Sequence, residues 1–326
     1  MKHHHKSICV TLTLLVLGGI ATGARADGET IAVFTKNQTN PFFQAVRVGA
    51  DLAAKSLGAK TLHYIPTKSD SISEQLSQIE DVVVKKPSAI VLDPVDYKAM
   101  VPGVEKINDA NIPVVNFADH SAGGSFVSFV GGDDYRISLE TARFLLKTIG
   151  GKGNIVIIEG VKGTLTNAER IRGFKDALAE NPDAKLVASQ PGNFQRLQAL
   201  QVMENLMQSN FQIDGVLAAN DAMATGVIEA LDAANRKAVV IGVNGTKEAV
   251  DAIKAGKLLA SGDYDGFIQG CVATMIAIRA ARKQPVVKEI VLKPAVITKD
   301  NYQPFDLPLE SRICPTWDDA AKLDTK

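Results

Sequence analysis

The chain has 326 residues, 46% of them hydrophobic, and its 36 basic and 36 acidic side chains balance at neutral pH. There is no basic excess of the kind that binds nucleic acid, so we expect no nucleic-acid partner. The length favours two domains over one, and the apolar content supplies material for two cores.

The first 26 residues have the features of an export signal. A basic start precedes an apolar stretch over residues 8–20, and Ala24-Arg25-Ala26 forms a small-residue cleavage site. The apolar stretch is shorter than the roughly 20 residues of a membrane-spanning helix, which disfavours an uncleaved anchor. We therefore expect residues 1–26 to be a signal peptide, cleaved after Ala26, and the protein to be exported.

Short β-branched runs alternate with helical patterns along the rest of the chain. Nearly all of these runs are continuously apolar, which is typical of strands covered on both faces. The ten predicted strands span residues 30–34, 60–65, 89–93, 113–117, 125–130, 154–159, 185–189, 215–219, 238–243 and 258–262. This alternation predicts an α/β fold with parallel sheets and right-handed crossovers.

The pattern starts twice, which favours two lobes over one large sheet. Gly131-Gly132 lies between a predicted strand and a predicted helix, where a crossing between lobes fits as well as a loop does. Beyond it, "GGKGNIVIIEG" restarts the plan with which "GETIAVF" began the first half.

Polar and aromatic side chains follow successive predicted strands. Ligands of open parallel sheets bind outside the carboxyl ends of the strands, so these residues are site candidates. They are Lys36, Asn40, Phe42, Phe43, Asp93, Asp119, His120, Arg170, Asn220, Asp221, Asn244, Asp263, Tyr264 and Asp265. Each Asn or Asp has a structural alternative as a helix cap or turn residue, and the functional interpretation depends on the set as a whole.

The candidate residues do not form a catalytic pattern. The chain has no G-x-S-x-G or H-E-x-x-H motif, and "GGKG" from Gly150 precedes its strand, where it cannot cradle a phosphate. We expect no enzymatic activity, no cofactor and no metal site. Hydroxyl groups both donate and accept, so carboxylates, amides and arginine satisfy them, while aromatic rings pack on the carbon faces of a sugar. The set predicts a carbohydrate-type ligand.

Two cysteines follow the export signal, Cys271 in a helical segment and Cys314 in a tail rich in proline. In an oxidising compartment such a pair predicts a disulfide, with two buried free thiols as the alternative. A disulfide would hold the tail, whose Pro304, Pro308 and Pro315 predict non-helical structure, against the body.

Six segments resemble, in order and spacing, the type I periplasmic solute-binding proteins of ABC transporters, within the group similar to ribose-binding proteins. They are "NPFFQAVRVGADLAAKSLG", "KPSAIVLDPVD", "ANIPVVNF", "TNAERIRGFKDAL", "NDAMATGVIEAL" and "VIGVNGTKEAVDAIKAGKL". The resemblance implies two Rossmann-like lobes that are joined by a three-crossover hinge. They would close over a monosaccharide or polyol and deliver it to the membrane permease of an ABC transporter.

The resemblance also implies domain boundaries. Residues 27–131 plus 265–297 would form the N-terminal lobe, and residues 132–264 plus 298–326 the C-terminal lobe and tail. We expect a monomer.

The resemblance assigns ligand contacts residue by residue. The matching positions are Asn40, Phe42, Phe43, Phe194, Arg170 of the R-x-x-G-F motif, Asn220, Asn244, Asp93, Asp119, Tyr264 and Lys36. Phe194 would approach the sugar from the lobe opposite Phe42 and Phe43.

Several of these positions depart from the ribose-binding pattern. Asp93 and Asn244 stand where ribose binders carry Asn and Asp, and Tyr264 stands where they carry Gln. Asp119-His120, or Ala118-Asp119 if no gap is allowed, replaces an Asp-Arg pair, and Lys36 replaces a small hydroxyl residue. Ribose itself is therefore not the expected ligand. Asp93 and Asp119 would pair with Lys36, which favours a neutral sugar or polyol over an acidic sugar.

The periodicity and the resemblance differ at Phe42. Phe42 begins the apolar stripe of its helix, which predicts a core position, whereas Phe43 lies about 100° round the helix and is free to face a cleft. The resemblance assigns both rings to the sugar.

Two other functions remain as alternatives, and a third is set aside. A chemotaxis or sensor-kinase receptor would bind the same ligand and differ in its partner. An exported sugar-modifying enzyme would need a catalytic pair in the cleft. A sugar-responsive repressor would need a DNA-binding segment where the signal peptide stands.

Overall fold

The computed structural model describes residue 1, residues 28–209 and residues 212–323. All but the first residue of the expected signal peptide lies outside the described residues. Within the described part of the chain, no helix has the length and apolar character needed to cross a membrane.

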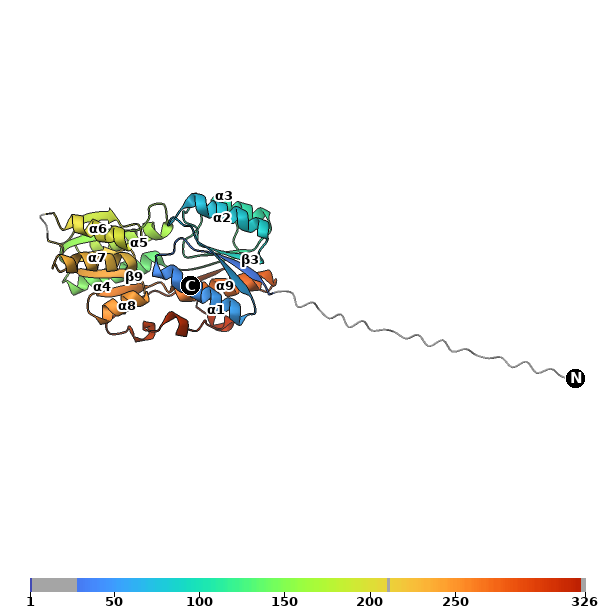
Figure 1. The fold of residues 1–326 in the computed structure, drawn as a ribbon. Helices are drawn as coiled ribbons and strands as arrows, with labels where there is room; N and C mark the ends of the chain where they lie inside the picture. Colours follow the sequence, from blue (N-terminus) through green and yellow to red (C-terminus); the bar gives the residue numbers. More distant parts are fainter. Residues whose placement is uncertain (2–27, 210–211, 324–326) are drawn as a thin grey trace.

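The chain forms two lobes, each built around a six-stranded sheet (Figure 1). The strands of the first sheet are β1 (Thr30–Phe34), β2 (Lys60–Tyr64), β3 (Ala89–Leu92), β4 (Val114–Phe117), β5 (Ser128–Gly132) and β11 (Glu289–Leu292). They lie in the order β11-β5-β4-β3-β1-β2 and are all parallel.

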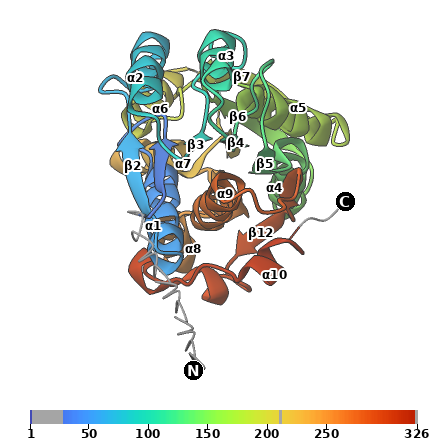
Figure 2. The ribbon, with the colours of Figure 1, turned by 90° about the vertical axis from the view of Figure 1, so that its right-hand side faces the viewer.

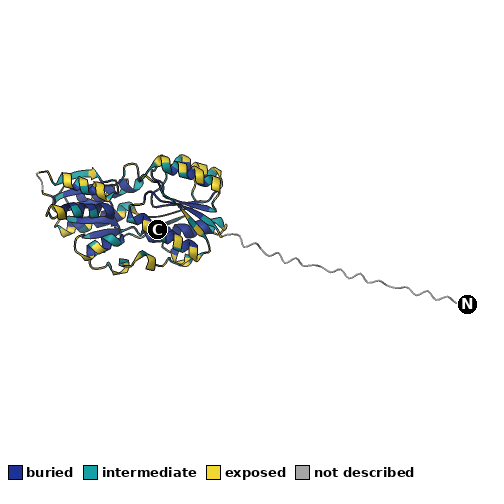
Figure 3. Cartoon of the chain, in the orientation of Figure 1, coloured by how far each residue is buried: buried dark blue, intermediate teal, exposed yellow. Residues whose placement is uncertain are grey.

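Four helices cover the first sheet. They are α1 (Pro41–Ser56), α2 (Ile72–Lys85), α3 (Val101–Asp109) and α9 (Gly266–Ala281). α1 and α9 share one apolar core with the sheet, and α2 and α3 share a second core with it. The inner strands β1, β3, β4 and β5 are therefore buried, as their continuous apolar character predicts, while the edge strand β2 and the outer faces of the helices are more exposed (Figure 3).

The second sheet repeats this plan with one antiparallel strand. Its strands are β6 (Gly153–Glu159), β7 (Ala184–Pro191), β8 (Gly215–Ala218), β9 (Val239–Asn244), β10 (Ala260–Asp263) and β12 (Ala295–Thr298). Its helices are α4 (Asp134–Thr148), α5 (Leu165–Ala179), α6 (Arg196–Leu206), α7 (Asp221–Ala233) and α8 (Lys247–Lys254). The order is β12-β10-β9-β8-β6-β7, and β12 runs antiparallel to β10. The α/β fold with two parallel-dominated sheets agrees with the sequence prediction.

All ten predicted strands are present, and the structure adds β11 and β12. Each added strand has only four residues and lies at the edge of its sheet. Both were missed although their sequences, EIVL and AVIT, are largely apolar, because each is short and was not recognised as a strand.

The chain crosses between the lobes three times. The first crossing joins β5 to α4 through Asp133, and the second joins β10 to α9 through Tyr264 and Asp265. The third joins β11 to β12, so it lies at residues 293–294. The expected boundary at residue 298 is therefore wrong, because Ala295 to Thr298 pair with β10 in the second sheet.

The tail after β12 contacts both lobes, whereas the sequence analysis grouped residues 298–326 with the C-terminal lobe and expected only the disulfide to hold the tail to the body. Tyr302 and Phe305 pack on the core of the second lobe, and Trp317 packs on the core that α1 and α9 form. In Figure 1 this dark red segment runs beneath both lobes. It also contains the short helices η1 (Gln303–Phe305), η2 (Leu309–Ser311) and α10 (Trp317–Ala320), so the prediction of a non-helical tail is wrong in part.

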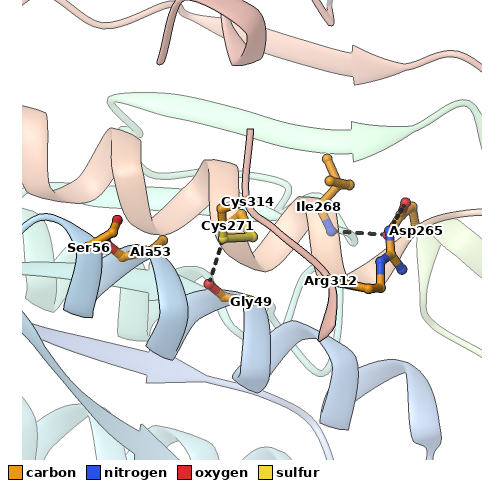
Figure 4. Close-up of a disulfide and its surroundings, with 8 residues drawn as sticks. All are labelled: Gly49, Ala53, Ser56, Asp265, Ile268, Cys271, Arg312 and Cys314. Carbon is orange, nitrogen blue, oxygen red and sulfur yellow. Dashed lines mark hydrogen bonds and ion pairs between the residues drawn. A yellow bond between two sulfur atoms is a disulfide. The ribbon is translucent and has the colours of Figure 1, made fainter. Parts of the chain in front are cut away.

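A disulfide joins the tail to the first lobe. Cys314 is bonded to Cys271 in the middle of α9, with 5.6 Å between the two Cα atoms (Figure 4). Arg312 pairs with Asp265 at 2.6 Å, just before α9 begins. Figure 2 shows α9 at the centre of this view, and α10 packs against it. The tail is thus anchored on the helix that follows the second crossing.

Candidate ligand-binding site

A cavity lies between the lobes, where the loops that follow the strands of both sheets meet. Its empty volume, counting space that opens to solvent, is about 400 Å³. The lining residues are Lys36, Asn37, Asn40, Phe42, Phe43, Asp70, Asp93, Ala118, Asp119, Thr166, Arg170, Phe194, Asn220, Asn244 and Tyr264.

Every residue to which the sequence analysis assigned a ligand contact lines this one cavity. His120 does not line it, because its ring stacks on Phe129 with 3.7 Å between the ring centroids. The sequence analysis left two alignments open here, Asp119-His120 and Ala118-Asp119. Ala118 and Asp119 both line the cavity, and Asp119 carries the charge there.

Lys36 is buried between two carboxylates. Its Nζ pairs with Asp119 and lies 3.4 Å from Asp93 Oδ1. Burial opposes the charge on Lys36, but Asp119 and Asp93 outweigh this and raise the lysine pKa above its usual value. Burial also acts on Asp119, where the nearby Lys36 prevails and the pKa is lowered. Lys36 and Asp119 therefore form an internally neutralised ion pair.

Asp93 has a different ionisation behaviour from Asp119. Burial raises the Asp93 pKa well above its usual range, although Lys36 acts in the opposite direction. Its Oδ1 accepts a hydrogen bond from the Asp119 backbone N–H at 3.2 Å. Its buried Oδ2 has no partner among the described residues. A buried polar atom without a partner is costly, so this oxygen is available to a ligand that brings one.

Arg170 lies on the opposite side of the cavity, in α5. Its Nε donates to Asp134 Oδ1 at 2.8 Å, and its Nη1 donates to the Ala219 carbonyl at 2.7 Å and to Asn244 Oδ1 at 3.2 Å. None of the described residues bonds Nη2, which is left for a ligand. The guanidinium also lies 4.7 Å from the centroid of the Tyr264 ring.

Three phenylalanines supply apolar walls from both lobes. Phe42 and Phe43, in the first turn of α1, are in edge contact with centroids 5.2 Å apart, and both are buried in the core. Phe194 comes from the loop between β7 and α6, and its ring lies so close to Gly160 that a Cβ there would meet it at 2.0 Å. Phe42 is therefore both a core residue and a cavity residue, so the two interpretations of this position are compatible.

Two of the asparagines also have the cap role that was the alternative for them. Asn40 Oδ1 accepts from the Phe42 N–H at the start of α1, and Asn220 Oδ1 accepts from the Met223 N–H at the start of α7. These bonds fix the side chains at the cavity wall. Structural and ligand-binding roles therefore coincide at the helix starts.

The lobes touch each other around the cavity. Asp119 Oδ1 accepts from the Thr166 backbone N–H at 2.9 Å, and Thr39 Oγ1 donates to Gln195 Oε1 at 3.0 Å. These contacts join the two lobes beside the cavity.

The sequence analysis missed four residues of this region. Asn37, Asp70 and Thr166 line the cavity, and Asp134 holds Arg170. Asn37 directly follows Lys36, and no periodic pattern marks it as a site residue. Asp70 and Thr166 do not follow a strand directly. Asp134 belongs to "GGDDY", which was interpreted only as a lobe crossing.

The described residues contain no group of three or more His, Cys, Asp and Glu side chains arranged to hold a metal ion.

Comparison with known proteins identifies the family. The profile of the periplasmic binding protein domain matches residues 31–285. The chain belongs to this family. It is also 31% identical over 289 residues to the ribose import binding protein of Haemophilus influenzae, covering 88% of this chain and 98% of that protein. It is 32% identical over 253 residues to the D-apiose import binding protein of Paraburkholderia graminis, covering 77% of this chain and 79% of that protein.

Solved structures of family members have the same fold. A periplasmic solute-binding protein of an ABC transporter from Actinobacillus succinogenes, with bound D-allose, superposes with a TM-score of 0.80 at 32% identity. That match covers 85% of this chain and 99% of the other. The Caulobacter myo-inositol binding protein, bound to myo-inositol, superposes with a TM-score of 0.79 at 29% identity, covering 86% and 96%. This periplasmic binding protein is therefore a binding protein and not an enzyme.

Proposed function

We propose that the protein is an exported receptor that binds a neutral monosaccharide or polyol between its lobes by hinge closure. It then delivers this ligand to the membrane permease of an ABC transporter. The observation that carries the choice of a neutral ligand is the internal pairing of the buried charges in the cavity.

The two cations that line the cavity already have anionic partners. Lys36 pairs with Asp119, and Arg170 pairs with Asp134. Buried charges need such partners, and an acidic sugar would bring an additional anion with no free cation to meet it. A neutral hydroxyl, by contrast, accepts from Arg170 Nη2 and bonds Asp93 Oδ2 without leaving a net charge.

The known ligands of related proteins agree with this class. The relatives are named for ribose, D-apiose and xylitol, and the superposed structures hold D-allose and myo-inositol. These compounds are neutral polyhydroxylated molecules of five or six carbons. The departures at Lys36, Asp93, Asn244 and Tyr264 favour a member of this class other than ribose.

Export completes the proposal. Residues 1–26 would direct the chain to the periplasm and be cleaved after Ala26, and the mature receptor would act as a monomer. N-terminal sequencing of the mature protein tests the cleavage site, with Asp27 as the expected first residue.

A thermal-shift screen tests the function. We expect at least one of D-ribose, D-allose, D-arabinose, xylitol and myo-inositol to raise the melting temperature, while D-glucuronate does not. Ligand at 100 times its dissociation constant stabilises the folded state by about 2.7 kcal/mol. Stabilisation by D-glucuronate alone would overturn the neutral-ligand assignment.

Arg170→Ala and Arg172→Ala form a matched pair for the site itself. Arg172 lies two residues further along α5 and pairs with the partly exposed Glu169 outside the cavity. Arg172→Ala should keep the ligand-induced shift and Arg170→Ala should lose it. Equal shifts in both variants would place the ligand elsewhere.

A further inference from the structure

Asp134 connects the ligand arginine to the hinge. It is the first residue of α4 and follows the first lobe crossing by one residue. The exposed fraction of its side chain is only 10%. No ligand contact was assigned to it, and it does not line the cavity.

Both carboxylate oxygens of Asp134 accept hydrogen bonds. Oδ1 accepts from Arg170 Nε at 2.8 Å, and Oδ2 accepts from Tyr264 Oη at 3.0 Å and from Thr166 Oγ1 at 3.1 Å. Arg170 and Thr166 belong to the second lobe, whereas Tyr264 lies in the second crossing. One buried carboxylate at the first crossing therefore holds the second crossing and the ligand arginine together.

Tyr264 extends this connection into the first lobe. Its ring belongs to the core that α1 and α9 form, and its centroid lies 5.7 Å from that of Phe42. Its hydroxyl also lies 3.2 Å from the Ala118 carbonyl. The single hydroxyl proton is therefore shared between this carbonyl and Asp134.

A glycine permits this placement of Tyr264. A Cβ on Gly132 would lie 2.6 Å from the Tyr264 ring, which is too close. The residue before the first crossing must therefore lack a side chain where the Tyr264 ring packs against it. The two crossings are thus packed directly on each other beside the cavity.

We propose that Asp134 is a positioning residue that couples Arg170 to the hinge, so that the orientation of the ligand-binding guanidinium depends on the closed arrangement of the lobes. The inference rests on the proposed function for the identity of the ligand. In the closed arrangement the Arg170–Asp134–Tyr264–Ala118 series is complete. Opening the lobes must break it at Tyr264, because Asp134 moves with the second lobe and the Tyr264 ring is packed in the first.

The first test measures affinity in Asp134→Asn. The probe is whichever of D-ribose, D-allose, D-arabinose, xylitol and myo-inositol stabilises the parent most. We expect roughly tenfold weaker binding by calorimetry, since one charge-assisted bond to Arg170 is replaced by a neutral one. Asp133→Asn makes the same substitution one residue earlier, at an exposed N-cap that Asn also satisfies, and should bind as the parent does.

The second test needs no ligand and follows lobe opening by small-angle X-ray scattering. Asp134→Asn and Tyr264→Phe should each increase the radius of gyration of the ligand-free protein, and the double variant should be no more open than the more open single variant. This non-additivity distinguishes coupling from a general loss of stability.

The outcomes are separable from those of the proposed function. If the parent binds none of the probes, the proposed function fails while the scattering comparison still decides the coupling. Parent-like affinity and a parent-like radius of gyration in Asp134→Asn would overturn the coupling. Additive opening in the double variant would overturn it as well.

Discussion

Asp119 in the first lobe accepts a hydrogen bond from the backbone N–H of Thr166, in the first turn of α5 in the second lobe, at 2.9 Å. The same carboxylate pairs with Lys36. A helix N-terminus favours an anion, and an ionised carboxylate accepts strongly from a backbone donor. Asp119 therefore joins the charge pair of one lobe to the first turn of a helix in the other.

Replacing Asp119 should weaken both the fold and its closure. Asp119→Asn leaves Lys36 with Asp93 alone, so we expect a loss on the order of 3 kcal/mol in the free energy of unfolding, measured with urea. Glu80→Gln breaks an exposed pair with Lys106 and should cost less than about 1 kcal/mol. Equal losses in the two variants would contradict a special role for the buried pair.

Phe42 should affect both stability and ligand binding. Phe42→Ala removes a buried ring that contacts Phe43 and Tyr264, so we expect a loss of about 3 to 5 kcal/mol in unfolding free energy. The probe sugar should also bind more weakly, because the ring lines the cavity. Val46→Ala, one turn along α1 and fully buried, should lower stability and leave affinity unchanged. Unchanged affinity in Phe42→Ala would make this residue structural only.

The disulfide between Cys271 and Cys314 should stabilise the mature protein. It closes a loop with a sequence separation of 43 residues, for which the chain-entropy estimate is about 4 kcal/mol. Cys314→Ser should lower the free energy of unfolding, measured with urea, by about this amount. Reduction of the parent should have the same effect. Peptide mapping without reduction should recover the two cysteines in one linked peptide. Recovery of two alkylated thiols from freshly exported protein would rule the bond out.

Asp263 should give stability a dependence on pH. Burial, reinforced by the neighbouring Asp265, raises the pKa of Asp263 to about 8. An Asp pKa that is higher in the folded state means that the folded protein holds the proton more tightly. Its contribution to stability is therefore fully present below the ordinary pKa near 4 and is lost as the pH rises through 8.

Asp263→Asn, which resembles the protonated form, should remove this dependence on pH. The variant should be increasingly more stable than the parent as the pH rises from 4 to 8.5, by thermal unfolding at each pH. Asp300→Asn provides an exposed comparison in the turn after β12. A stability difference between Asp263→Asn and the parent that stays constant over this range would contradict the raised pKa.

Sequence patterns predicted most of the fold because each pattern is local. A strand such as β3 is covered on both faces and is apolar at every position, so it is recognisable without its neighbours. β12 has partly exposed residues and pairs antiparallel with β10, a contact between segments more than thirty residues apart. Its assignment to the wrong lobe followed from the absence of a local signal for that pairing.

The candidate site was predictable where a ligand residue directly follows a strand. Lys36, Asp93 and Asn220 were found by this rule, and all of them line the cavity. Asp134 was missed because its importance depends on Arg170 and Tyr264, which reach it from distant parts of the chain. Nothing within "GGDDY" distinguishes Asp134, which holds the arginine, from Asp133, which caps the helix.

The sequence by itself determined the two α/β lobes, the polar and aromatic composition of the cleft and the cysteine pair, since these follow from periodicity, strand ends and residue type. Only the tertiary structure decided that Asp93 keeps an unpartnered oxygen, that Asp134 holds Arg170, and that the tail contacts both lobes. The physical reason is that a buried charge takes its ionisation and its partner from groups that folding brings together from both lobes, and no local pattern encodes that choice.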